Sequence, residues 1–106
     1  MELDKHALAT VDLYPPERNG RPIPILPGMW RADIAFDMRD GQFGFATILD
    51  RELDHGEVRQ VYLTFRRPDL VMPKLRRGLR FFYCTGHAIG EGTIIDFDPD
   101  GLVVAG

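Results

Sequence analysis

Alternation of apolar and polar side chains is the feature that most constrains the fold of this chain. It is clearest in residues 30–37, where Trp30, Ala32, Ile34 and Phe36 fall at every second position. A helix would scatter these side chains around its circumference, whereas an extended strand collects them on one face. The segment is therefore predicted to be a half-buried β-strand.

Further strand-like segments recur at short intervals, some with the same alternation and others marked by hairpin turns between apolar runs. Besides 30–37, they are 6–14, 42–49, 58–65, 79–84 and 88–97. The 11 glycines and 8 prolines recur between these segments, as turn residues do in β proteins. Residues 17–22 are predicted to form an exposed turn and 68–77 a loop, and no segment is typical of a helix. About six short strands without a helix predict an all-β fold, either a closed barrel or a sandwich.

The size of the chain fits a single domain. With 106 residues, it is expected to form one β-barrel unit over 1–106, with its core at about 6–97 and a short C-terminal tail at 98–106. No apolar run reaches the length of a membrane span, and the N-terminus lacks a signal-peptide layout, so a cytoplasmic protein is expected. The single cysteine, Cys84, excludes an internal disulfide and a thiolate zinc cluster.

Positive charge is concentrated in one part of an acidic chain. The net charge is −3, yet residues 66–80 contain six basic residues and one acid, a local charge of +5. We call these basic residues the basic stripe: Arg66, Arg67, Lys74, Arg76, Arg77 and Arg80. Such a stripe could bind phosphates or an acidic protein surface, and a solvated loop is an equally good interpretation.

Residues that could carry out chemistry are sparse. His6, His55 and His87 lack the spacing of a metal site, and the acidic loop around His55 is better explained as a solvated connection than as a cation site. Cys84 and His87 could form a nucleophilic pair, but no third group is evident to orient the histidine, so a buried structural thiol is favoured. Serine is absent. No catalytic residue, metal or cofactor is predicted.

The glycines of residues 86–92 superficially suggest a phosphate-binding loop. Such loops work because a helix N-terminus follows them, whereas here the β-branched run Thr93-Ile94-Ile95 follows. Nucleotide binding is therefore not expected. In a strand, Gly90 and Gly92 would instead allow close backbone approach or sharp curvature.

The same glycines belong to a sequence pattern that resembles a known protein family. Gly78-Leu79-Arg80-Phe81 and the segment Gly86-His87-Ala88-Ile89-Gly90-Glu91-Gly92 resemble the closing hairpin of the C-terminal domain of elongation factor Tu. Upstream, residues 19–28 are similar to the Gly-Gly-Arg and Gly-Tyr-Arg region of that family. Residues 55–68 resemble its Pro-Gly-Asp turn, the strand after it and the proline exit. These correspondences run in order from about Val11 to Ile95.

The resemblance implies a six-stranded antiparallel β-barrel without catalytic activity. In the parent factor one surface of this barrel contacts the T-stem of aminoacyl-tRNA, and another packs on the GTPase domain. Arg21, Arg31 and Asp33 fall at or near the positions used around the tRNA surface, and Arg80 lies on the strand that faces the GTPase domain. His87 replaces an arginine, and Asp33 replaces an uncharged amide, which places a carboxylate where phosphate would approach.

These observations lead to three hypotheses of function. The first is a stand-alone binding module for a protein partner, in an adaptor or immunity-type role. The second is an RNA- or tRNA-binding module that uses the basic stripe, and the third, the weakest, is an enzyme. The candidate binding residues are Arg21, Arg31, Asp33, Arg66, Arg67, Arg76, Arg77, Arg80 and His87.

Overall fold

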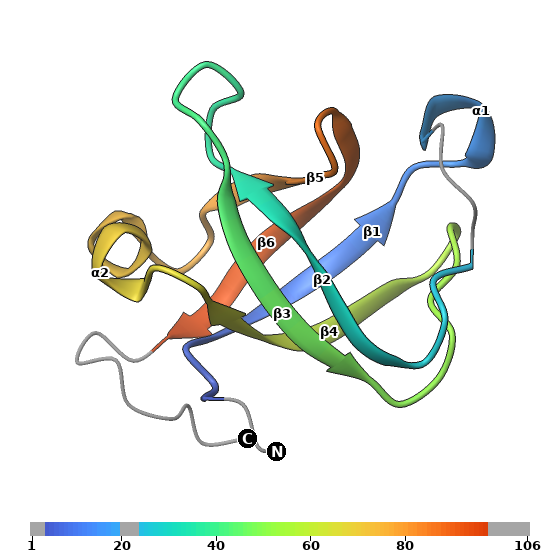
Figure 1. Ribbon diagram of the computed structural model, residues 1–106, viewed down its shortest axis with the longest axis horizontal. Helices are drawn as coiled ribbons and strands as arrows, with labels where there is room; N and C mark the ends of the chain where they lie inside the picture. Colours follow the sequence, from blue (N-terminus) through green and yellow to red (C-terminus); the bar gives the residue numbers. More distant parts are fainter. Residues whose placement is uncertain (1–3, 20–23, 98–106) are drawn as a thin grey trace.

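The chain forms a closed barrel of six antiparallel strands in the order β1-β4-β3-β2-β5-β6 (Figure 1). The computed structural model describes residues 4–19 and 24–97. The strands are β1 (Ala7–Leu13), β2 (Gly28–Ala35), β3 (Phe43–Leu49), β4 (Val58–Phe65), β5 (Arg80–Cys84) and β6 (Ala88–Phe97). This confirms the predicted all-β, six-stranded antiparallel barrel.

The interior of the barrel is filled by side chains at alternate strand positions, as the sequence pattern predicted. Four aromatic residues meet at its centre. The ring of Tyr83 lies 4.9 Å from that of Phe81 and 5.5 Å from that of Phe45, and Trp30 meets Phe45 edge-on at 5.1 Å. Edge-to-face contacts of this kind are favourable because the positive edge of one ring meets the negative face of another.

Two glycines of β6 let β1 approach closely. A β-carbon on Gly92 would lie 2.4 Å from the carbonyl oxygen of Thr10, and one on Gly90 would lie 2.7 Å from that of Asp12. Both distances are shorter than a side chain can tolerate. The predicted close approach at these two positions is confirmed.

Short helices occupy two segments that were predicted to be a turn and a loop. They are α1 (Pro16–Asn19), α2 (Pro68–Val71) and the 3-10 turn η1 (Met72–Lys74). The prediction of 68–77 as a loop without helix was wrong because a four-residue helix is too short to show helical periodicity, and because proline is favoured in a first turn. The buried side chains of Val71 and Leu75 join the core, so α2 and η1 cover one end of the barrel (Figure 1). None of the described helices has the length and apolar character needed to span a bilayer.

Candidate binding face

A groove of about 610 Å³ crosses the outer face of three neighbouring strands, β2, β3 and β4. Strand pairing builds it from two rows of residues. In one row Arg31 of β2 lies opposite Ala46 of β3, which lies opposite Thr64 of β4. In the next row Asp33 lies opposite Gly44, whose carbonyl oxygen accepts a hydrogen bond from the backbone N–H of Arg66 at 3.0 Å. The groove therefore joins three predicted binding residues, Arg31, Asp33 and Arg66.

The groove is hollow because the middle strand has small residues at its outward positions. Gly44 and Ala46 occupy alternate positions along β3 and add little volume between β2 and β4, where the stem of Arg66 lies over Gly44. A β-carbon on Gly44 would lie 3.4 Å from the side chain of Arg66 and 3.7 Å from the carboxylate of Asp33. The register is regular through Gly44, so this glycine does not form the β-bulge that a glycine within a strand can indicate. Its effect is to keep the floor of the groove low.

Both arginines of the groove are exposed. Among the residues that the structure describes, neither Arg31 nor Arg66 forms an ion pair within 4.0 Å. The Nε of Arg31 lies 3.1 Å from the sulfur of Met29, which is a weak acceptor. Asp33 is half-buried. The groove thus contains two positively charged guanidinium groups and one carboxylate, which gives it an excess of positive charge.

An apolar pair borders the groove. Met29 and Ile48 lie directly opposite each other on β2 and β3, one row beyond Arg31 and Ala46, and are 43% and 54% exposed. Ile48 also lines a second, smaller hollow of about 280 Å³ together with Tyr62. We call the groove and this apolar pair the β2–β3–β4 face.

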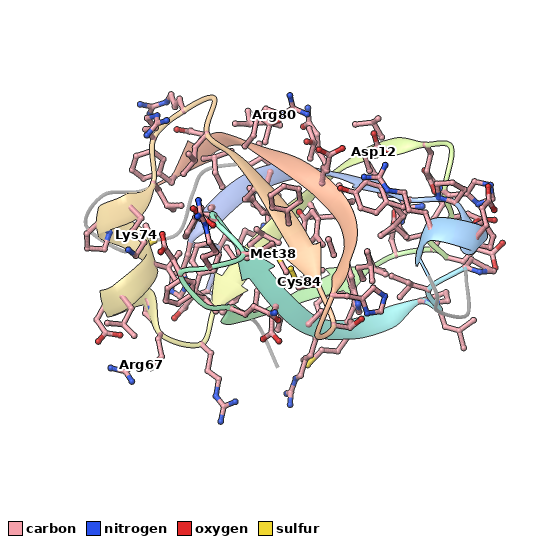
Figure 2. All side chains as sticks on the ribbon, turned by 90° about the horizontal axis from the view of Figure 1, so that it is seen from above. Asp12, Met38, Arg67, Lys74, Arg80 and Cys84 are labelled. Carbon is pink, nitrogen blue, oxygen red and sulfur yellow. The ribbon has the colours of Figure 1, made fainter. Side chains whose placement is uncertain are left out.

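The basic stripe does not form one continuous surface. Three of its arginines are bound to nearby carboxylates: Arg67 to Asp69 at 2.8 Å, Arg77 to Asp96 at 2.7 Å and Arg80 to Glu91 at 3.4 Å. Figure 2 shows Arg67 and Arg80 on opposite sides of the barrel, with Lys74 between them at one end. Local pairing and this dispersion reduce the positive field that phosphates would meet.

The other predicted binding residues lie away from the groove or outside the described structure. Arg76 is exposed, and Lys74 lies 5.9 Å from the ring of Phe43. His87 is exposed in the turn between β5 and β6, and it does not line the groove. Arg21 lies outside the described residues.

Cys84 has the environment of a structural thiol, as predicted. It is fully buried, and its sulfur lies 3.5 Å from that of Met38 on the β2–β3 connection (Figure 2). Burial, together with the nearby carboxylate of Asp33, raises the pKa of the thiol. Because the thiolate is the nucleophilic form, this environment works against reactivity. In the described part of the chain no cluster of three metal-ligating side chains occurs.

A strand arginine that the sequence analysis did not single out organises the acidic loop at 50–57. Arg59 of β4 donates hydrogen bonds to the carbonyl oxygens of Arg51 at 3.0 Å and Glu52 at 2.6 Å. It also donates to the carboxylate of Glu57 at 2.8 Å, which in turn accepts from the backbone N–H of Asp54. The acidic loop is thus a structured connection fixed to β4.

This arrangement predicts a pH dependence of stability through Glu57. Desolvation alone would raise the pKa of this carboxyl, but the Asp54 N–H and the guanidiniums of Arg59 and Arg51 hold it below its ordinary value of 4.5. The stabilisation is therefore complete above pH 4.5 and is lost as the pH falls through the lower pKa of the folded state. In urea unfolding between pH 7 and pH 3, we expect Glu57→Gln to lose less stability than the wild type. Parallel pH profiles for the two proteins would contradict this role of Glu57.

No family model matches this chain, and no curated protein matches it either. The resemblance to the C-terminal domain of elongation factor Tu stays a prediction.

Proposed function

We propose that the protein is a non-catalytic binding module that engages a protein partner through the β2–β3–β4 face. The observation that carries the proposal is the groove, where two guanidiniums that form no ion pair with any described residue lie beside the exposed pair Met29 and Ile48. Arginine and methionine are enriched where proteins meet, and a buried apolar centre with polar neighbours is typical of such contacts. An adaptor or immunity-type role would use a surface of this kind.

Binding of RNA or tRNA is the alternative that this surface must be tested against. It is supported by the family resemblance and by Arg31, Arg66 and Arg76, which are exposed and form no ion pair with the residues that the structure describes. The local ion pairs of the basic stripe weigh against it, because phosphate binding depends on the number of cations available to displace counterions.

The test compares matched variants in affinity capture from cells of the source organism. Immobilised wild-type protein should enrich a protein partner, and Ile48→Glu should reduce the recovery by about tenfold or more, as expected for a central interface residue. Leu70→Glu is the control, because Leu70 lies on α2 and is similarly exposed, at 45%. It should retain the partner, and nuclease treatment should leave the recovery unchanged.

Two outcomes would contradict this proposal. Recovery of nucleic acid alone, with an affinity that falls steeply with salt, would favour the RNA alternative. Equal loss of the protein partner in Ile48→Glu and Leu70→Glu would place the contact away from the β2–β3–β4 face.

A further inference from the structure

We propose that the groove binds a side-chain carboxylate of an acidic protein segment, held between Arg31 and Arg66. The inference rests on the proposed function and adds the chemistry of the partner. It follows from the excess positive charge of the two arginines, which line the groove from β2 and from the end of β4 and form no ion pair within the described part of the chain.

The strand arrangement sets the distance between the two guanidinium groups. Arg31 is on β2 and Arg66 follows β4, two strands away and one outward row along, so their backbones are about 12 Å apart at the usual strand spacing and rise per residue. Over this span the floor is formed by Gly44 and Ala46, which leave room for a group from outside. The planar fork of an arginine matches the two oxygens of a carboxylate, so both side chains can bind one acidic group above the floor.

Asp33 limits what the groove can accept. Its half-buried carboxylate lies in the same row as Gly44, so an extended chain of phosphates would place repeated negative charge beside it. A single carboxylate places only one negative charge near Asp33, so it meets less of this repulsion while it binds Arg31 and Arg66. The groove therefore favours an isolated acidic side chain over a nucleic-acid backbone.

The apolar border gives the second part of the recognition. A protein segment can place an apolar side chain on Met29 and Ile48 while its acidic neighbour enters the groove. RNA would be expected to use an aromatic ring for base stacking on such a surface. The nearby ring of Tyr62 is already covered by the ammonium group of Lys5, which lies 4.5 Å from the ring centre.

The test uses a short, labelled, end-blocked peptide rich in glutamate with one isoleucine, against the same peptide with glutamine at every glutamate. Binding is measured by fluorescence anisotropy and located by amide NMR shifts. The glutamate peptide should bind and shift the signals of Gly44 and Ala46. Arg31→Ala and Arg66→Ala should each weaken binding about threefold to fivefold, and Asp33→Asn should tighten it about twofold.

The control variant is Arg76→Ala, because Arg76 is an exposed arginine that does not line the groove. It should leave the affinity for the peptide unchanged. Thermal unfolding of each variant checks that the outward substitutions leave the barrel intact.

The inference would be overturned by equal binding of the glutamine peptide, by equal weakening in Arg76→Ala, or by tighter binding of a single-stranded oligouridylate with shifts in the same groove. If the peptide did not bind but the protein still captured a partner through Ile48, the inferred carboxylate recognition would be refuted and the proposed function would stand. Loss of the Ile48-dependent capture would instead refute the proposed function.

Discussion

Gly92→Ala is expected to lower the free energy of unfolding by about 3 kcal/mol, the upper part of the range for adding one carbon to a packed core. The new β-carbon would lie 2.4 Å from the Thr10 carbonyl oxygen, 2.7 Å from a ring carbon of Phe81 and 2.8 Å from one of Tyr83. The first contact is backbone of the neighbouring strand, and the other two are buried rings. None can move without separating β1 from β6 or displacing the aromatic core. Urea unfolding followed by circular dichroism measures the change.

The matched control is Gly44→Ala on the outer face. The atoms nearest to its β-carbon would be Cβ and Cδ of Arg66, both at 3.4 Å, and a carboxylate oxygen of Asp33 at 3.7 Å, which are ordinary van der Waals distances. We expect a change within about 0.5 kcal/mol, the usual range for surface substitutions. Equal stability of the two variants would mean that β1 and β6 do not approach as closely as the structure shows.

The strands could be predicted because their signal is local. Alternation in 58–65 gives the observed bounds of β4, since each inward side chain is identified by its neighbours alone. The turn at 85–87 and the β-branched run Thr93-Ile94-Ile95 likewise predicted β6 at 88–97. The four-residue α2 could not be found in this way. This helix is stabilised by a tertiary contact, because its single turn places the side chain of Val71 in the core at the end of the barrel.

The sequence allowed individual residues of the candidate site to be predicted, but not their arrangement in space. Arg31 and Asp33 were selected by a family resemblance and Arg66 by local charge, and nothing in the sequence shows that β3 joins them into one groove. That juxtaposition depends on register, because a shift of one residue would turn these side chains inward. The pairing of Arg77 with Asp96 and of Arg80 with Glu91 was missed for the same reason.

Tyr83 is the core residue whose truncation should be most costly. It is fully buried among Trp30, Phe45 and Phe81, and its hydroxyl donates a hydrogen bond to the Thr10 carbonyl oxygen at 2.8 Å. Tyr83→Ala should reduce the free energy of unfolding by about 3–5 kcal/mol, the cost of removing a large aromatic side chain from a core. Tyr83→Phe keeps the ring and should cost about 1 kcal/mol for the lost hydrogen bond.

Measurements at alkaline pH distinguish the contribution of the Tyr83 hydroxyl to stability from that of its packed ring. Burial raises the pKa of Tyr83 far above its ordinary value of 10.0, so the phenol stays protonated in the folded barrel while it ionises in the unfolded chain. Its contribution to stability is complete below pH 10.0 and declines as the pH rises above that value, because the folded state then holds the proton more tightly. Urea unfolding between pH 8 and pH 11 should therefore show a steeper loss in the wild type than in Tyr83→Phe. If the two proteins lost stability in parallel, the hydroxyl would not have the buried position beside Thr10 that links β5 over β6 to β1. If Tyr83→Phe cost as much as Tyr83→Ala at neutral pH, the packing of the ring would not be the main contribution of Tyr83.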